Sequence, residues 1–341
     1  MKAGYLDFLG AKPADRREVY AEATTQWPTN AQFIEKDLFV CAALSVLFND
    51  DPAEAGKLVF KGGTSLSKAH GLIQRFSEDI DLVIVREELG FKGDRDPFDP
   101  ACDLSRNKRE QLIKDLQAAA AAHIQEKLKP LIEAAFKPLG CEVTTDPGSG
   151  GETLLVAYPS AFDKLDVYVR PVIKIEAGAR SATLPARKAT IRPYVQDIVP
   201  DTDLIAEHVQ TVDAERTFLD KVLILHGRHA KFRDLGVIHK DANKESRHYY
   251  DLALMADNVG PAAIANKALL ADVIRHSSLA FSSAWMKMDE AADGRLLISP
   301  PEGMRHALKS DYTAMTGMIM GEPPEFDAII RKIDKIAETL S

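Results

Sequence analysis

The chain has 341 residues, of which 45% are hydrophobic and 28% are charged, a composition typical of a folded globular protein. This length suggests two domains or one elaborated domain. The formal net charge of -8 argues against a protein that coats nucleic acid without specificity, although it leaves room for a local basic site.

The three cysteines are far apart and odd in number, which predicts neither a disulfide framework nor a thiolate metal site. The first twenty residues contain no apolar signal core, and no stretch of ~18 apolar residues occurs anywhere. We therefore expect a cytoplasmic protein with no membrane contact.

The first half of the chain predicts a compact α/β unit. Apolar residues recur at helical spacing over residues 31–48, and KLVF at 57–60 is typical of a short buried strand. A glycine pair follows, then a predicted helix over residues 64–76 and a second strand, IDLVIV, at 80–85.

Beyond a polar loop at 86–101, residues 104–139 are expected to be helical, and residues 165–177 alternate as a half-buried strand requires. From residue 213 onward the pattern is helical almost to the end. We predict an α/β domain with a mixed sheet over residues 1–205, followed by a mainly α-helical domain over residues 206–341.

The glycine pair, Gly62 and Gly63, opens the most informative segment of the chain. Without a Cβ atom, these residues let a phosphate group approach their backbone N–H groups closely. Thr64 or Ser65 is placed to cap the next helix, whose N-terminus carries a partial positive charge. The segment therefore predicts an anion cradle.

Asp79 and Asp81 lie two residues apart on the predicted strand, so both side chains leave the same face with Cα atoms ~6.6 Å apart. Two carboxylates on one face beside a phosphate cradle suit a pair of Mg²⁺ (or Mn²⁺) ions that bridge phosphate oxygens and activate an attacking hydroxyl. Either motif alone is most often a simple turn or a solvated strand end, but their combination is much less common.

The segment VFKGGTSLSKAHGLIQRFSEDIDLVI resembles the signature of the DNA-polymerase-β-like nucleotidyltransferase superfamily. More narrowly, the chain resembles the AbiEii/AbiGii family of nucleotidyltransferase toxins. Three further segments carry this resemblance, FIEKDLFV at 33–40, ERTFLDKVLILH at 215–226 and SRHYYDLALM at 246–255. It covers roughly residues 30 to 335.

The resemblance implies a third acidic residue on a later strand of the same sheet. Glu176 is the best candidate, with Asp163 and Asp166 as rivals in the preceding segment. The alternative for Glu176 is a simple ion pair with Lys174 on a solvated strand face.

The resemblance also implies that Lys221 contacts the phosphates of the nucleotide, where a compact ammonium suits a triphosphate. Arg247 and Asp251, four residues apart, face the same way on a helix and are placed to pair with each other. Asp251 is expected to organise the active site by holding Lys221 or a substrate group. A snorkelling lysine and an ordinary intrahelical ion pair are the structural alternatives.

Two segments depart from the overall acidity: residues 170–192 hold six Arg/Lys against one acid, and residues 215–248 hold eight against five. They suggest a basic groove for a polyanion such as RNA. The resemblance implies an NTP-using toxin with a cognate antitoxin, whose acceptor is an RNA such as the 3′ end of tRNA. Transfer to a small molecule, as in antibiotic-modifying relatives, and a non-catalytic nucleotide-binding protein of the same fold are the alternatives.

Overall fold

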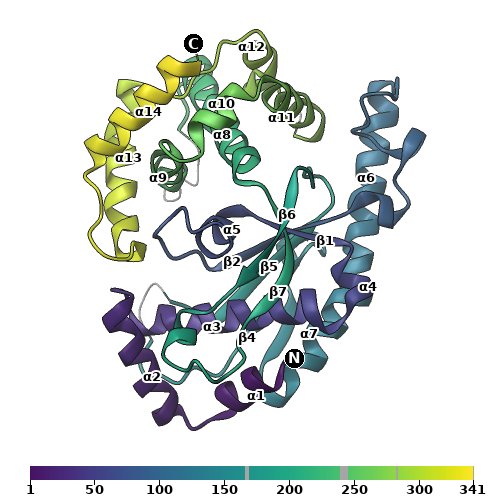
Figure 1. Cartoon of the computed structure of the whole chain (residues 1–341). Helices are drawn as coiled ribbons and strands as arrows, with labels where there is room; N and C mark the ends of the chain where they lie inside the picture. Colours follow the sequence, from purple (N-terminus) through teal and green to yellow (C-terminus); the bar gives the residue numbers. More distant parts are fainter. Residues whose placement is uncertain (166–168, 239–244, 282, 341) are drawn as a thin grey trace. The chain divides into compact units, whose positions relative to one another are not determined.

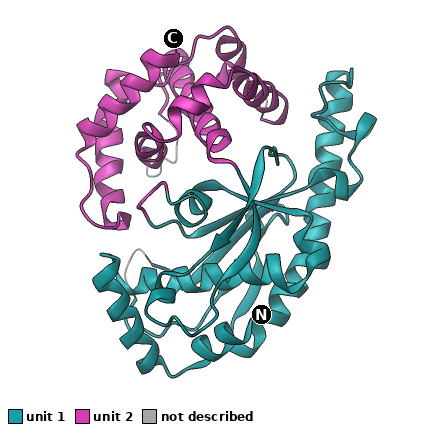
Figure 2. Cartoon of the chain, viewed as in Figure 1, with its two compact units in different colours: residues 1–71, 76–212 teal, residues 72–75, 213–341 magenta. Residues whose placement is uncertain are grey.

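The computed structural model describes residues 1–165, 169–238, 245–281 and 283–340. The chain forms two compact units (Figure 2), of which unit 1 comprises residues 1–71 and 76–212 and unit 2 comprises residues 72–75 and 213–341. The predicted boundary near residue 205 lies just before the last strand of unit 1. Four residues of the segment that joins the glycine pair to the aspartate strand belong to unit 2.

Unit 1 is built on a seven-stranded mixed sheet (Figure 1) with the strand order β3-β4-β5-β2-β1-β7-β6. β2 pairs with β5, and β1 with β7, in parallel, whereas the other neighbours are antiparallel. The strands are β1 (Leu58–Lys61), β2 (Asp79–Ile84), β3 (Glu142–Thr145), β4 (Thr153–Ala157), β5 (Val172–Gly178), β6 (Ala186–Ile191) and β7 (Ala206–Val212).

Helices surround this sheet, and the central one, α3, packs along β2, β5 and β7. Every residue of α3 from Phe33 to Ser45 is buried, which explains why its apolar pattern extends almost all round the helix. The helices of unit 1 are α1 (Ala3–Gly10), α2 (Pro13–Gln26), α3 (Ala31–Ser45), α4 (Pro52–Ala55), α5 (Gly62–Lys68), α6 (Arg106–His123) and α7 (Lys129–Phe136).

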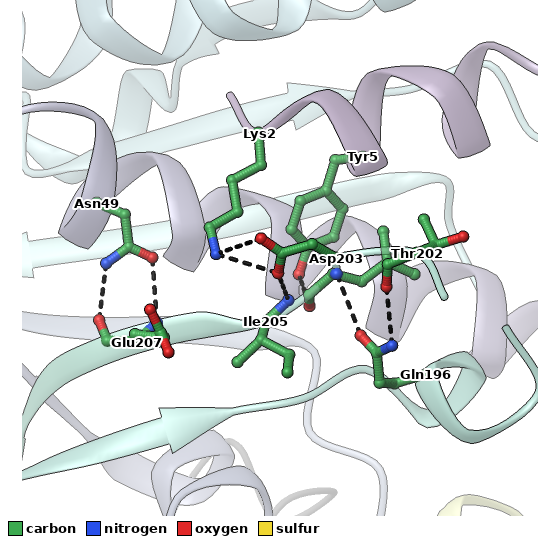
Figure 3. Close-up of polar contacts among 9 residues, drawn as sticks. Lys2, Tyr5, Asn49, Gln196, Thr202, Asp203, Ile205 and Glu207 are labelled. Atoms are coloured by element: carbon green, nitrogen blue, oxygen red, sulfur yellow. Dashed lines mark hydrogen bonds and ion pairs between the residues drawn. The ribbon is translucent and has the colours of Figure 1, made fainter. Parts of the chain in front are cut away.

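The N-terminal helix fixes the segment that leads into β7 (Figure 3). The ammonium of Lys2 pairs with Asp203, and the hydroxyl of Tyr5 donates to the carbonyl of Leu204. A Cβ atom on Gly4 would lie 2.5 Å from the carbonyl oxygen of Asp203, so only glycine permits this close approach. Asn49, after α3, exchanges two hydrogen bonds with the backbone of Glu207.

Unit 2 is helical, as predicted. Its helices are α8 (Ala214–Leu235), α9 (Ser246–Met255), α10 (Gly260–Ala265), α11 (Lys267–Ala280), α12 (Met288–Ala292), α13 (Glu302–Met315) and α14 (Phe326–Leu340). α8 packs against α9, α10 and α11, and α9 packs against α13 and α14. Within the described part of the chain, no helix combines the length and apolar character that a membrane crossing needs.

The mixed sheet and the helical second half confirm the predicted fold class, but two element boundaries were wrong. The helix after the glycine pair ends at Lys68 and not at Phe76, because the chain then enters the irregular segment that contributes to unit 2. The strand predicted over residues 165–177 begins only at Val172, since Pro171 lacks the N–H group that a ladder requires. Residues 166–168 lie outside the described part.

Candidate active site

β2 carries the two aspartates as the sequence predicts. Asp79 and Asp81 are half-buried, whereas Ile80 and Leu82 are buried. Because side chains alternate along a strand, both carboxyl groups leave the same face of the sheet. β2 lies between β1 and β5 in the interior of the sheet, so the aspartates stand on a rigid support.

Glu176 lies on the neighbouring strand, directly opposite Asp81 in the register, and Lys174 lies opposite Asp79. Paired residues of adjacent strands point to the same face, so these four side chains share one side of the sheet. We call Asp79, Asp81 and Glu176 the acidic face. The carboxylate of Glu176 forms an ion pair with Lys174, the contact that the alternative interpretation of this residue expects.

The rivals of Glu176 do not belong to this arrangement. The carboxylate of Asp163 is almost fully exposed and lies 3.9 Å from the guanidinium of Arg17 on α2. Asp166 lies outside the described residues.

The electrostatics of the acidic face favour a bound cation. Burial raises the pKa of Asp79, and the carboxylates of Glu78, Asp81 and Glu176 raise it further, to about 6. The nearby ammonium of Lys174 opposes this effect only in part. In the described part of the chain, no three His, Cys, Asp or Glu side chains converge as a ready-made metal shell. Asp79 and Asp81 fit a metal, whereas Glu176 must first leave Lys174.

The side chain of Asp81 requires a glycine at position 62. It has φ +80°, a backbone conformation that favours glycine, and a Cβ atom there would lie 1.9 Å from Oδ2 of Asp81. The preceding residue, Lys61, pairs with Asp81 in the register of β1 and β2. The turn and the carboxylate strand are therefore in direct contact, and Gly63 follows as the second residue of α5.

The expected capping by Thr64 or Ser65 does not occur, because α5 begins at Gly62 with Lys61 as its N-cap residue. The hydroxyl of Thr64 donates to the backbone carbonyl of Asp79, and that of Ser65 donates to the carbonyl of Gly62 at 2.9 Å. Both residues are buried. Their side chains hold the turn against β2, which leaves the backbone N–H groups as the donors that could meet a phosphate.

Three consecutive charged residues, Glu35, Lys36 and Asp37, are buried on α3; Lys36 and Asp37 support this site, whereas Glu35 anchors the segment after β4, and none of these roles was predicted. Each is at most 3% exposed. Asp37 pairs with Lys68 at 2.8 Å and accepts a hydrogen bond from the backbone N–H of Tyr194, so it ties the end of α5 to α3. Their signal was visible in FIEKDLFV, since charges inside an otherwise apolar helix must find buried partners.

In unit 2, Lys221 and Asp251 come together with Arg75. The Nζ atom of Lys221 lies 2.8 Å from Oδ2 of Asp251, and Arg75 donates two hydrogen bonds of 2.8 Å to the same carboxylate. We call these three residues the paired cluster. The guanidinium that clamps Asp251 is thus that of Arg75, which is distant in sequence, and not that of the predicted Arg247.

The charges of the paired cluster compensate one another. Burial alone would raise the pKa of Asp251, but the charges of Arg75 and Lys221 outweigh it and hold that pKa well below its usual range. Burial lowers the pKa of Lys221, while Asp251 acts in the opposite direction. The ammonium of Lys221 therefore already has a fixed carboxylate partner.

The two basic segments differ in their surroundings. In the first, Arg187, Lys188 and Arg192 are exposed on or just after β6, an edge strand of the sheet. In the described part of the second, four basic residues pair with acids of unit 2: the ion pairs are Arg216–Asp272, Lys221–Asp251, Arg228–Glu245 and Arg233–Glu290. Among the described residues of the two segments, those of the first present exposed basic side chains along an edge strand, with Arg192 also 3.5 Å from Asp197.

Comparisons with known proteins agree with this architecture. Residues 45–332 match the model of a family described as nucleotidyl transferase AbiEii toxin, type IV TA system. Among solved structures, the chain resembles MenT4, a nucleotidyltransferase toxin from Mycobacterium tuberculosis H37Rv, with 17% sequence identity and a TM-score of 0.50. This similarity covers 95% of the present chain and 89% of MenT4, and at that identity it supports the fold. A comparison with curated protein sequences found no match.

The family match spans most of the chain and includes the glycine turn, β2, β5 and the paired cluster. It sets aside the non-catalytic alternative. The chain belongs to the AbiEii family of nucleotidyltransferase toxins of type IV toxin–antitoxin systems.

Proposed function

We propose that the protein is a metal-dependent enzyme that transfers a nucleoside monophosphate from an NTP to an RNA acceptor, the 3′ end of tRNA. The observation that carries this proposal is the acidic face beside the Gly62 turn. In the reaction, an acceptor hydroxyl oxygen bonds to the α-phosphorus and gives up its proton to solvent, the bond from that phosphorus to the bridging oxygen of the β-phosphate breaks, and pyrophosphate leaves.

Asp79 and Asp81 would hold the divalent metal, and Glu176 would join them after releasing Lys174. The raised pKa of Asp79 supports this assignment, because a cation relieves the repulsion among the neighbouring carboxylates. Such a metal, Mg²⁺ or Mn²⁺, supplies charge stabilisation at the reacting phosphate and lowers the pKa of a bound hydroxyl. The strands fix the carboxylates in advance, so little reorganisation is needed.

For the nucleotide, the backbone N–H groups of Gly62 and Gly63 would receive phosphate oxygens, with Thr64 and Ser65 holding the turn in shape. Lys221 would neutralise phosphate charge, with Asp251 fixing its ammonium. Lys221→Ala should then raise the KM for NTP strongly, and Lys221→Arg should rescue only part of the loss because the guanidinium has a different shape. Unchanged kinetics in Lys221→Ala would make the residue purely structural.

The RNA acceptor is supported by the exposed basic residues of β6. RNA binding through phosphate contacts releases counterions, so it should weaken steeply between ~50 and ~200 mM salt. Reversing charge at Arg187 and Lys188 together should weaken RNA binding and flatten this salt dependence while leaving NTP binding nearly intact. Lys188→Glu alone is the cleaner variant, because Arg187 also contacts Nδ1 of His70 at 2.6 Å.

The acceptor is tested by incubating the protein and Mg²⁺ with each labelled NTP and, in turn, tRNA, other RNA and a panel of aminoglycosides. We expect label at the 3′ end of tRNA and none in the aminoglycosides. Label in a small molecule but never in RNA would refute the RNA acceptor and support the antibiotic-modifying alternative. Asp81→Asn serves as the inactive control.

The type IV family implies an antitoxin partner. We also propose that toxin and antitoxin act in the cytoplasm, which is supported by three cysteines that remain free thiols in the structure.

A further inference from the structure

Lys36 on α3 is a buried lysine whose ammonium joins two strands. Its side chain is 2% exposed, and it forms an ion pair with Glu78 and donates a hydrogen bond of 3.0 Å to the backbone carbonyl of Arg170. A buried ammonium is stable only with such partners. Glu78 directly precedes β2, and Arg170 lies just before β5.

These two strands are the parallel neighbours that carry the acidic face, in which Asp81 pairs with Glu176. Because parallel strands run in the same direction, a contact that joins their beginnings fixes how far one is displaced along the other. The displacement matters here, since a slip of one residue would send every side chain of a strand to the opposite face.

We propose that Lys36 is a positioning residue for nucleotidyl transfer, which holds the beginnings of β2 and β5 together so that Asp79, Asp81 and Glu176 stay within reach of one metal ion. The inference rests on the proposed role of these three acids. Lys36 itself lies outside the residues that match the family model, which start at residue 45. Lys36 also pairs the carboxylate of Glu78, which is adjacent to Asp79 in the chain, so that Glu78 is held at α3.

The neighbours of Lys36 show what a purely stabilising role would look like. Glu35 accepts hydrogen bonds from the hydroxyl of Ser160 and the backbone N–H of Ala161, so it anchors the segment after β4. Neither partner lies on β2 or β5. If Lys36 were only an anchor of this kind, its removal would lower stability without changing how a folded molecule binds metal.

The test uses the double variant Lys36→Met/Glu78→Gln, which removes the ion pair but leaves its net charge at zero. Because the carboxylate of Glu78 also contributes to the electrostatics of Asp79, Lys36→Arg, which keeps both charges of the pair, is measured beside it to separate geometry from charge. Replacing a buried ion pair with uncharged groups of similar volume is often tolerated, so we expect this variant to fold. Ile132→Val, a buried truncation on α7, is the control for a general loss of stability.

Mn²⁺ binding is measured by calorimetry, and kcat and KM are measured with NTP and tRNA. In the double variant we expect the Kd for Mn²⁺ to rise about 10-fold, the lower end of the effect of removing a direct outer-shell partner, because Lys36 acts on the ligands only through the strands. The kcat should fall with it, while the KM for NTP at saturating Mn²⁺ changes little. Mn²⁺ affinity and kcat equal to those of Ile132→Val would overturn the proposal.

Two further variants make every result informative. If the double variant does not fold, Lys36→Arg keeps the charge but alters the donor geometry, and it should weaken Mn²⁺ binding to a smaller extent. Wild-type Mn²⁺ affinity in Lys36→Arg would then count against the proposal. Asp81→Asn tests the proposed function separately: if it binds Mn²⁺ normally, the metal site itself is misassigned. If Asp81→Asn loses Mn²⁺ binding but the Lys36 variants do not, only the proposed role of Lys36 is overturned.

Discussion

The acidic face and the paired cluster are two groups of charged side chains with opposite electrostatic character. In the acidic face, neighbouring carboxylates raise the pKa of Asp79, and Lys174 compensates them only in part. In the paired cluster, Arg75 and Lys221 surround Asp251, which is fully buried, and hold its pKa well below the usual range. The acidic face keeps an excess of negative charge, whereas the paired cluster contains the positive charge that compensates its carboxylate.

This difference indicates that the carboxylates of the acidic face need a bound cation, whereas the residues of the paired cluster already neutralise one another. Carboxylates that repel one another reduce the stability of the fold, and such an arrangement is common where function requires it. A carboxylate that two cations clamp contributes to stability and holds those cations in place. The two groups should therefore respond in opposite ways to mutation.

The largest effect is expected for transfer activity in Asp79→Ala or Asp81→Ala. Each change removes a proposed metal ligand, and metal stabilisation is worth several kcal/mol of barrier. Label transfer should be abolished, while circular dichroism shows an intact fold. Retention of more than about a tenth of wild-type activity, or a loss of less than ~1.4 kcal/mol, would contradict the assignment.

The next effect concerns stability in unit 2. Asp251→Asn leaves the charges of Arg75 and Lys221 buried without their carboxylate, which typically destabilises by about 3–5 kcal/mol. A denaturant titration that follows a probe in unit 2 measures this loss. Arg305→Gln is a suitable control, because the side chain of its partner, Glu302, is 92% exposed and the pair contributes little. Equal stability of the two variants would show that the paired cluster is not an integral part of unit 2.

Gly62→Ala should lower both stability and activity, because its Cβ atom would displace the carboxylate of Asp81. Gly71→Ala is the matched control: Gly71 also has positive φ, at +63°, but an added Cβ atom there meets nothing within 4 Å. Both variants bear the backbone strain of about 1–2 kcal/mol, whereas only Gly62→Ala should lose transfer activity. Similar activity losses in both would mean that strain, and not contact with Asp81, explains the glycine.

A smaller effect depends on pH. The pKa of Asp79 is raised in the folded state, so its protonated form favours folding below about pH 4, and this contribution is lost as the pH rises through about 6. Without metal at pH 7.5, Asp79→Asn should therefore be more stable than wild type, by about 1–2 kcal/mol after solvent screening. The advantage should vanish near pH 4. Thermal melts in EDTA across this range measure it, and a destabilised Asn variant at pH 7.5 would be the contrary result.

The sequence alone predicted much of the fold, because its strongest elements are locally encoded. The apolar pattern over residues 31–48, the strand containing Asp79 and Asp81 and the helical second half all follow from periodicity. The end of α5 could not be predicted from periodicity. Residues 72–75 pack in unit 2 through contacts distant in sequence, such as the backbone hydrogen bond from Met320 to Gln74.

The candidate site was predictable where spacing within one segment decides the geometry, as for Asp79 and Asp81. It was not predictable where partners come from distant segments. The clamp of Arg75 on Asp251 joins residues 176 positions apart, and the contact of Lys36 with the carbonyl of Arg170 joins residues 134 positions apart. Similarly, Gly62 was predicted for its freedom to approach a phosphate, but the structure adds the close approach of Asp81.

The most direct test is the shift in melting temperature on adding Mg²⁺ at pH 7.5 to wild type, Asp79→Asn and Asp251→Asn. A ligand that binds only the folded state raises its stability, so Mg²⁺ should raise the melting temperature of wild type. The shift should disappear in Asp79→Asn and persist in Asp251→Asn, whose lower starting stability leaves the acidic face unchanged. An equal Mg²⁺ shift in wild type and Asp79→Asn would contradict the assignment of the acidic face as the metal site.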